Sequence, residues 1–209
     1  MKDNVVILAD GDFPVTEYPH SILRSADKII CCDASVLKLK QNTSLECYRI
    51  AGDMDTLPPH EYERYKDIVV QEREQETNDL SKAFRFAMTL DPESIIILGA
   101  TGHREDHTLG NISLLADYSA LFPNIRMVTD YGTFIPYNDS FSMEAERGSI
   151  VSIFCFDQSV QIKSSGLEYS TDKVVFDRWW KATLNRVVSS PFSLELSHPA
   201  PVLIYVPQL

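Results

Sequence analysis

The sequence has no surplus of basic residues: 19 Lys and Arg stand against 30 Asp and Glu, giving a formal net charge of −11 at pH 7. Nucleic acids and anionic membranes attract proteins through basic patches, so this composition argues against both as partners. A divalent cation can still bridge an acidic protein and a polyphosphate. The chain also lacks a long apolar run near its first residue, since Val5–Ala9 is too short for a signal peptide or a transmembrane helix. We therefore expect a cytoplasmic protein.

Cysteine is scarce, and the spacings of several familiar sites are missing. The four cysteines (Cys31, Cys32, Cys47 and Cys155) form no CxxC pair and are typical of reduced core thiols. The histidines show neither HxH nor HExxH spacing, which argues against a zinc site. Walker and dinucleotide-binding glycine motifs are also absent.

Short apolar runs alternate with helical patterns over roughly the first 129 residues. The runs are nearly continuous, as expected for strands buried on both faces. Helical periodicity is clearest in Asn78–Leu90, with Thr77 or Asn78 as the expected N-cap, and recurs in Glu105–Ala120. The alternation predicts an α/β domain with a mostly parallel sheet. The expected strands are Val5–Ala9, Lys28–Asp33, Tyr48–Ala51, Ile68–Gln71, Ser94–Leu98 and Ile125–Thr129.

The pattern changes after Asp130–Gly132, where short runs are separated by turn residues and no long helical pattern appears. This predicts a small all-β sandwich, so that residues 1–130 and 131–209 form two domains. The runs are Gly132–Tyr137, Ser149–Phe156, Val160–Ser164 and Pro201–Val206.

Four polar clusters lie where the expected strands end or the next helix begins. They are Cys32–Ser35, Gly52–Asp55, Asn78–Lys82 and Gly99–His107. Ligands of open parallel sheets bind beyond the carboxyl ends of the strands. Because unpaired aspartates are costly to bury, the clusters predict one site that binds a metal and an anion.

The first three clusters supply carboxylates and a cation. Gly52 permits a tight turn, after which Asp53 and Asp55 can both face one hard cation such as Mg²⁺. Asp79 opens a helix, and Lys82 lies on the same helical face. The alternative is a solvated acidic turn and a helix-capping acid favoured by the helix dipole.

Gly99–His107 combines groups suited to phosphate. Gly99 and Gly102 permit close backbone approach, and the guanidinium of Arg104 matches phosphate oxygens. Asp106 and His107 begin the next helix, whose N-terminus favours anions, and Asn111 follows one turn later. The alternative, a capped helix with Arg104 paired to a neighbouring acid, explains Asp106 but not the whole combination.

Trp179 and Trp180 stand out in the second half. If they lie in a strand, their indoles face opposite sides of the sheet, and one can stack on an aromatic ligand while the other fills the core. One core indole and one interface indole is the alternative.

Taken in order, these motifs resemble the thiamine pyrophosphokinase family, and the likeness covers essentially the whole chain. It rests on Asp33–Ser35, Gly52–Thr56, Thr77–Ala83, Gly99–His107 with Leu109 and Asn111, Gly166–Tyr169 and Thr183–Asn185. The resemblance implies transfer of the pyrophosphoryl group of ATP to the hydroxyl of thiamine, which yields thiamine diphosphate and AMP. It further implies an ATP- and Mg²⁺-binding α/β domain, a β-sandwich that binds thiamine and forms the dimer, and a homodimer with active sites at the subunit interface.

The resemblance and phosphoryl-transfer chemistry together assign roles. Asp53, Asp55 and Asp79 are expected to bind Mg²⁺, Lys82 and Arg104 to add positive charge, and Asp106 to accept or orient the hydroxyl proton. An aromatic face suits thiamine, which is cationic and aromatic. The remaining expected site residues are Asp33, Ser35, Gly52, Thr56, Gly99, Gly102, His107 and Asn111 on the nucleotide side, and Thr183, Asn185, Trp179 and Trp180 on the thiamine side.

Several positions depart from the family pattern. Ala34 and Ser35 replace glycines beside Asp33, His103 replaces a glycine, Leu184 replaces a serine and Thr56 replaces another serine. None of these changes removes an expected metal carboxylate. Two alternatives stay open: a pyrophosphokinase for another small alcohol such as a hydroxymethylpterin, and a non-catalytic module that binds thiamine or a nucleotide.

Overall fold

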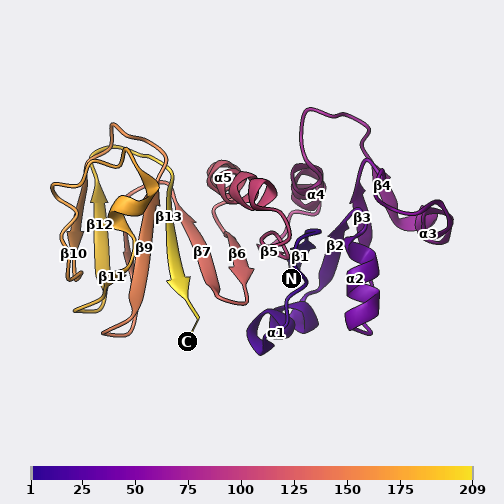
Figure 1. Ribbon diagram of the computed structural model, residues 1–209, viewed down its shortest axis with the longest axis horizontal. Helices are drawn as coiled ribbons and strands as arrows, with labels where there is room; N and C mark the ends of the chain where they lie inside the picture. The colour runs from indigo at the N-terminus through magenta and orange to yellow at the C-terminus, as the bar shows by residue number, and fades with distance from the viewer. Residues whose placement is uncertain (1, 209) are drawn as a thin grey trace. The chain divides into compact units, whose positions relative to one another are not determined.

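The computed structural model describes residues 2–208, which divide into two compact units (Figure 1). The first unit takes in the chain up to Leu114 together with Asn124–Asp130, and the second takes in Leu115–Pro123 and the residues from Tyr131 onward. The α/β class with a mostly parallel sheet, followed by a small β sandwich, is confirmed.

Six parallel strands form the sheet of the first unit, in the order β6-β5-β1-β2-β3-β4. Each lies within one residue of its expected position at either end. The apolar runs explain this agreement, because the central strands are buried on both faces. For example, Val5, Ile7 and Ile97 are each 0 % exposed, as is Ile30. The strands are β1 (Asn4–Leu8), β2 (Lys28–Cys32), β3 (Arg49–Gly52), β4 (Val69–Gln71), β5 (Ser94–Leu98) and β6 (Ile125–Thr129).

Helices connect these strands, and one of them carries Asp79 and Lys82 and packs against the sheet. That helix is α4 (Asp79–Met88), which packs on β1, β2 and β3 through a face that includes Leu80, Ala83, Phe84 and Ala87. The helical pattern of α5 (Glu105–Leu121) predicts one apolar side that includes Leu109 and Leu115. This side is only partly buried, since Leu115 lies in the core whereas Leu109 is 54 % exposed. The other helices are α1 (Glu17–Ser25), α2 (Ser35–Asn42), α3 (Pro59–Tyr65), η1 (Lys66–Ile68) and α5 (Glu105–Leu121).

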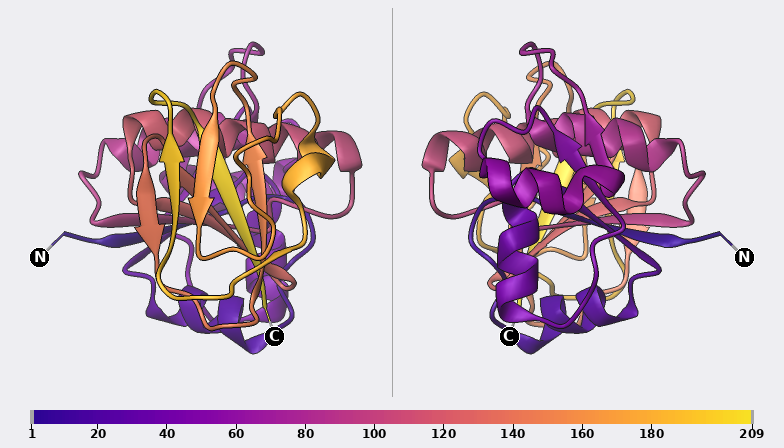
Figure 2. Two further views of the ribbon diagram at one scale, coloured as in Figure 1. Left: turned by 90° about the vertical axis from the view of Figure 1, so that its left-hand side faces the viewer. Right: turned by 90° about the vertical axis from the view of Figure 1, so that its right-hand side faces the viewer.

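Two antiparallel sheets, β11-β9-β13-β7 and β10-β12-β8, make up the second unit. Val151, Ile153, Phe192, Leu194 and Val202 are among the residues of its core. The left view of Figure 2 looks onto its strands, coloured orange to yellow. They are β7 (Gly132–Tyr137), β8 (Phe141–Met143), β9 (Ile150–Cys155), β10 (Ile162–Ser165), β11 (Asn185–Arg186), β12 (Phe192–Leu196) and β13 (Val202–Pro207).

Three features of the second unit differ from the sequence-based picture or add to it. The strands β8, β11 and β12 were not among the expected runs. The conditional placement of Trp179 and Trp180 in a strand is wrong, because both lie in the short 3₁₀ helix η2 (Trp179–Ala182). Trp179 packs edge-to-face on Phe154 and Phe156, with ring centroids 6.4 and 5.4 Å apart, and this packing anchors the turn.

All four cysteines are free thiols, and Cys31, Cys32 and Cys155 are buried. Between residues 2 and 208, none of the helices combines the length and the hydropathy needed to cross a bilayer.

Replacing Phe192 with Ala should destabilise the second unit by about 3–5 kcal/mol, because this side chain is 0 % exposed and its removal leaves a cavity. Both tryptophans of the chain lie in this unit, so tryptophan fluorescence during urea unfolding reports on it directly. Val175→Ala is the control, since Val175 is 58 % exposed and its truncation should change the free energy of unfolding by about 0.5 kcal/mol or less. Equal unfolding midpoints for the two variants would contradict this account of the core.

Candidate functional site

Strand ends and one helix start gather the expected site residues of the first unit. Asp33 follows β2, Gly52 ends β3, Asp79 begins α4 and Gly99 follows β5. Because β5, β1, β2 and β3 are parallel neighbours, their carboxyl ends meet at one edge of the sheet.

Three carboxylates converge at this edge. Asp33, Asp53 and Asp79, called here the acidic cluster, each place one oxygen within 4.8 Å of the other two. Asp33 is 1 % exposed; its Oδ2 accepts a hydrogen bond from Thr56 N at 3.2 Å, whereas its Oδ1 is buried without a hydrogen-bond partner. A buried carboxylate oxygen with no donor is costly, and oxygen ligands of this kind suit Mg²⁺. The residues present therefore fit a divalent cation.

Lys82 inserts a positive charge into the acidic cluster. Its Nζ lies 3.1 Å from Asp79 Oδ1 and 3.5 Å from Asp53 Oδ2, and the residue is 1 % exposed. Burial by itself would lower the pKa of Lys82, but the hydrogen bonds and charges of Asp79 and Asp53 outweigh it and raise that pKa. The ammonium therefore stays charged and partly neutralises the cluster.

The three aspartates respond differently to this environment. Burial raises the pKa of Asp33, and it also raises the pKa of Asp79 despite the opposing effect of Lys82. Burial would raise the pKa of Asp53 as well, but hydrogen bonds from Gln75 and Asp55 N, with the charge of Lys82, lower it overall. Asp53 is consequently the member of the cluster whose ionised form the protein favours.

The approach of Asp53 to Asp79 depends on Gly52. A Cβ atom at this position would lie 3.0 Å from Asp79 Oδ1, and Asp53 N donates to the same oxygen at 3.3 Å. Asp55 does not belong to the group of three carboxylates found among residues 2–208. Its side chain is exposed, while its backbone N donates to Asp53 Oδ1 at 3.1 Å. The structure thus brings Asp33 beside Asp53 and Asp79, and a metal-binding role for Asp55 stays a prediction.

The start of α4 is tied to the loop after β5. Asn78 is the N-cap: its Oδ1 accepts from Ser81 N at 3.0 Å, and its Nδ2 donates to Asn111 Oδ1 at 3.1 Å. Asn111 is buried and donates through Nδ2 to Ala100 O at 2.9 Å. Asn111 therefore links the start of α4, where Asp79 lies, to the loop from Gly99 to Gly102, called here the glycine loop.

The loop from Gly99 to Gly102 takes positive φ angles at both glycines, 64° and 76°. A Cβ on Gly99 would lie 2.7 Å from Ala9 O, so a larger residue would clash with the end of β1. The segment after β1 extends the pairing, because Gly11 N donates to Gly99 O at 2.7 Å and Asp12 N donates to Thr101 O at 2.9 Å.

That segment after β1 is a site element that sequence reasoning missed. Asp10, Gly11 and Asp12 directly follow an apolar run, as the four recognised clusters do, and this was the available signal. Lys38 secures the segment from α2 by donating to Asp10 O and Gly11 O, both at 2.8 Å.

Arg104 and Asp106 form an exposed ion pair. Arg104 Nε donates to Asp106 Oδ1 at 3.0 Å and Nη2 donates to Oδ2 at 2.5 Å, as in the alternative in which Arg104 pairs with a neighbouring acid. The hydrogen bond from Arg104 lowers the pKa of Asp106 to about 2. At neutral pH this carboxylate is a weak base that is nevertheless able to accept a hydrogen bond. The His107 side chain is exposed, and its backbone N donates to Asp106 Oδ1 at 2.9 Å.

Two further residues that were expected on the nucleotide side form hydrogen bonds within the protein. Ser35 is fully buried, and its hydroxyl donates to Leu8 O at 2.8 Å, joining α2 to β1. Thr56 contributes its backbone N to Asp33, as described above.

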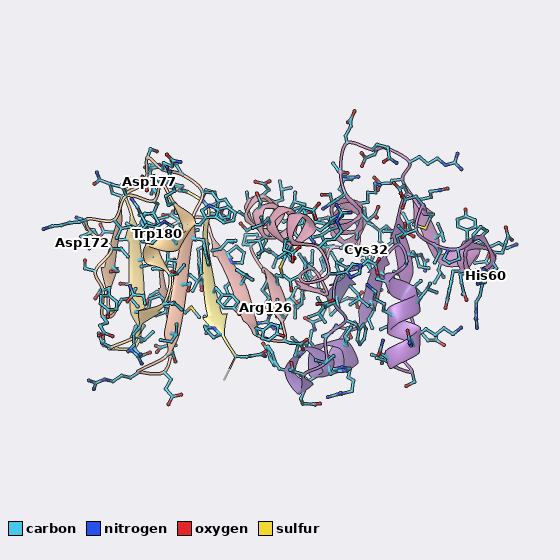
Figure 3. The ribbon with its side chains drawn as sticks, in the orientation of Figure 1. Cys32, His60, Arg126, Asp172, Asp177 and Trp180 are labelled. Carbon is cyan, nitrogen blue, oxygen red and sulfur yellow. The ribbon has the colours of Figure 1, made fainter. Side chains whose placement is uncertain are left out.

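The expected thiamine-side residues lie in the second unit. Asn185 is 4 % exposed; its amide donates to Tyr169 O at 2.7 Å and accepts from Tyr169 N at 3.1 Å. Thr183 donates through Oγ1 to Trp180 O at 2.8 Å. Trp180 is 71 % exposed and is labelled beside η2 in Figure 3, so its indole is available for contact, whereas Trp179 is partly covered. Thr183 and Asn185 also line a small cavity of about 100 Å³ with Tyr169, Ser170, Thr171, Val174, Lys181 and Ala182.

Family models match both halves of the chain. The model described as the thiamin pyrophosphokinase catalytic domain matches residues 19–129, and the model of the thiamin pyrophosphokinase substrate-binding domain matches residues 132–205.

Curated relatives match over shorter segments. The chain is 34 % identical over 142 residues to thiamine pyrophosphokinase 1 of Oryza sativa subsp. japonica, covering 59 % of this chain and 52 % of the relative. It is 36 % identical over 80 residues to thiamine pyrophosphokinase of Bacillus subtilis, covering 36 % of each. The chain thus spans about half or less of the length of these relatives.

Solved structures match over nearly the full length and show the same fold. A thiamin pyrophosphokinase family protein from Enterococcus faecalis superimposes with a TM-score of 0.79 at 19 % identity and covers 99 % of both chains. The thiamine pyrophosphokinase from Bacillus subtilis gives a TM-score of 0.76 at 20 % identity, covering 98 % of this chain and 99 % of its own.

Replacing Lys82 with Met should destabilise the protein by about 3–5 kcal/mol without added metal, because Asp53 and Asp79 lose their buried counter-charge. Added Mg²⁺ should then stabilise this variant more than the wild type. Thermal unfolding followed by far-UV circular dichroism, with and without Mg²⁺, measures both effects. Lys66→Met is the control, since the Lys66 side chain is 59 % exposed. Wild-type stability in metal-free Lys82→Met would exclude the proposed compensation.

Replacing Asp33 with Asn should stabilise the metal-free protein at neutral pH. Folding raises the pKa of Asp33 above its ordinary value of 3.8, so its ionisation opposes folding, fully so above the raised pKa and not at all below 3.8. The advantage of the variant should therefore shrink as the pH falls toward 3.8. Urea midpoints across this pH range provide the test, with the exposed Asp67→Asn as the matched control. An Asp33→Asn variant less stable than wild type at neutral pH would contradict the inferred cost of ionising Asp33 in the folded protein.

Proposed function

Because the chain belongs to the thiamine pyrophosphokinase family, we propose that it transfers the pyrophosphoryl group of ATP to the hydroxyl of thiamine. The products are thiamine diphosphate and AMP. The observation that carries this proposal is the acidic cluster with Lys82 at the carboxyl edge of the sheet, inside the segment matched by the catalytic-domain model. Such a cluster suits polyphosphate chemistry, because it can hold the cation that accompanies ATP.

The reaction requires in-line displacement at the β-phosphorus. The thiamine hydroxyl oxygen forms a bond to the β-phosphorus and releases its proton to water. The bond from the β-phosphorus to the oxygen that bridges it to the α-phosphorus breaks, and AMP leaves with that bond's electron pair. Most of the catalysis in such transfers comes from positioning and from neutralising phosphate charge.

Asp33, Asp53 and Asp79 are the residues proposed to hold Mg²⁺, and the unpartnered Oδ1 of Asp33 supports this set. Asp55, expected from the resemblance, is proposed to join them when the nucleotide is bound. Bound Mg²⁺ supplies charge neutralisation at the phosphate oxygens. The protein's own part is to orient these carboxylates and to keep Asp53 ionised, which the hydrogen bonds to Asp53 favour.

Fixed cations complete the phosphate side of the proposed site. Lys82 holds its charge at the acidic cluster, and Arg104 can exchange part of its exposed pair with Asp106 for phosphate oxygens. Gly99 and Gly102 take positive φ angles where a Cβ atom would collide with Ala9 O and Asp12 Oδ2, and the loop that they shape is proposed to offer its backbone groups to the nucleotide. Asp106 orients the thiamine hydroxyl by accepting its hydrogen bond, a role that suits a carboxylate with a pKa of about 2.

Thiamine is proposed to bind through the second unit, where the substrate-binding model matches. Trp180 offers an exposed aromatic face to a cationic ring, while Asn185 and Thr183 shape the neighbouring backbone. A homodimer with sites at the subunit interface and a cytoplasmic location are proposed from the family resemblance and the sequence.

AMP formation should require ATP, thiamine and Mg²⁺ together, and Asp53→Asn should lower its rate by about 100-fold or more, because a group that stabilises phosphate charge is lost. Chromatographic measurement of AMP with each component omitted tests the first statement. Asp67→Asn, which removes an exposed carboxylate outside the acidic cluster, should retain wild-type activity.

Each open alternative has its own outcome in this assay. A tenfold preference for a hydroxymethylpterin over thiamine would replace the proposed substrate. Thiamine or nucleotide binding in calorimetry without any AMP would identify a binding module.

A further inference from the structure

The loop between β4 and α4 sends one side chain into the acidic cluster. This segment, Glu72–Asn78, is called here the β4–α4 loop and is visible in Figure 1 as a long connection between the two elements. Gln75 Nε2 donates to Asp53 Oδ2 at 2.8 Å, the same oxygen that lies 3.5 Å from Lys82 Nζ. Asp53 Oδ1 meanwhile accepts from Asp55 N at 3.1 Å. Donors on both oxygens fix the plane of the Asp53 carboxylate.

The β4–α4 loop has no apolar anchor of its own. Each residue from Glu72 to Asn78 is exposed or half-buried. Its conformation therefore depends on polar contacts, and without them Gln75 would not be held at Asp53.

Arg85 supplies the main external contacts of the loop. From the outer face of α4, its Nη2 donates to Glu72 Oε2 at 2.5 Å and to Glu74 Oε1 at 2.8 Å, and its Nη1 donates to Thr77 Oγ1 at 3.2 Å. One guanidinium thus joins three positions of the β4–α4 loop to a helix that is itself packed on the sheet.

Glu74 carries this restraint to the backbone around Gln75. Its Oε2 accepts from Glu76 N at 2.8 Å and from Thr77 N at 3.0 Å, while its Oε1 accepts from Thr77 Oγ1 and Arg85. The hydrogen bond from Thr77, with the others, lowers the pKa of Glu74 to about 2, so the group stays ionised at neutral pH. The Glu74 carboxylate thus closes a turn around Gln75 by bonding to the two residues that follow it.

We propose that Arg85 is a positioning residue for the cation site: through Glu74 and the β4–α4 loop it holds Gln75 on Asp53 and pre-orients that carboxylate. Arg85 acts on the cluster through the loop, since its hydrogen bonds reach Glu72, Glu74 and Thr77. An oriented carboxylate loses less freedom when a cation binds, so the effect appears as cation affinity. The inference rests on the metal-binding part of the proposed function.

Binding of Mn²⁺, followed by its electron paramagnetic resonance signal in the full-length protein without substrates, tests this role. Arg85→Gln should weaken Mn²⁺ binding by about tenfold, the lower end of what loss of an outer-shell partner costs. Arg85→Lys keeps the charge but cannot bridge three partners. Its Mn²⁺ affinity should therefore lie between those of Arg85→Gln and the wild type. Arg64→Gln is the matched control, because Arg64 is similarly exposed and its nearest carboxylate, on Glu61, is 3.9 Å away. Far-UV melting should show Arg85→Gln folded at the assay temperature.

A double-mutant cycle distinguishes the loop pathway from a simple charge effect. Gln75→Met removes the donor to Asp53, so Arg85→Gln should add little further loss of Mn²⁺ affinity in that background. Fully additive losses, or an Arg85→Gln variant with wild-type affinity, would overturn the proposal. A wild-type protein without an Asp53-dependent Mn²⁺ site would overturn it together with the proposed metal site. Arg85-dependent Mn²⁺ binding without thiamine-dependent AMP formation would support it and overturn the proposed reaction alone.

Discussion

The repulsion among three carboxylates at one sheet edge is the constraint on which the first unit depends. One carboxylate oxygen from each of Asp33, Asp53 and Asp79 lies within 4.8 Å of the other two, and partial burial strengthens the repulsion between the charges. Lys82 offsets part of it from the same helix that carries Asp79. The packing of α4 on β1, β2 and β3 keeps that ammonium in place. The same carboxylate repulsion that lowers the stability of this edge thus also favours the binding of a cation there.

The surrounding loops support the same arrangement through side-chain and backbone hydrogen bonds. Asn78 caps α4 and contacts Asn111, which in turn holds the loop after β5 through Ala100 O. The segment after β1 pairs with that loop at Gly99 and Thr101. A short path of hydrogen bonds thus joins the glycine loop to Asn78, the residue before Asp79 of the acidic cluster. In contrast, Arg104 and Asp106 neutralise each other at an exposed position, where a ligand can separate them at low cost.

The two units illustrate different uses of polar side chains. In the first, the buried charges of Lys82 and Asp33 lie at the acidic cluster, and Asp33 Oδ1 has no hydrogen-bond partner. In the second, the buried amide of Asn185 forms hydrogen bonds with both backbone groups of Tyr169 and so holds two segments of the backbone together. The most exposed aromatic residues described in the second unit are Tyr131, Trp180 and Tyr169.

The sequence by itself determined the α/β and β order, the strand positions and the family. A continuous apolar run such as Ser94–Leu98 is typical of a strand that a parallel sheet buries on both faces. The order of the motifs along the chain can be read without knowing how the loops fold. Only the tertiary structure decided which carboxylates share a site. Met54 takes a φ of 68° and buries its side chain in the core, which turns Asp55 outward and leaves Asp33 to face Asp53 and Asp79. Likewise, packing on Phe154 and Phe156 placed Trp179 in a 3₁₀ turn, and contacts across the β4–α4 loop brought Gln75 to Asp53. Local pattern encodes burial, whereas the meeting of distant side chains depends on turn geometry and long-range packing that no single segment specifies.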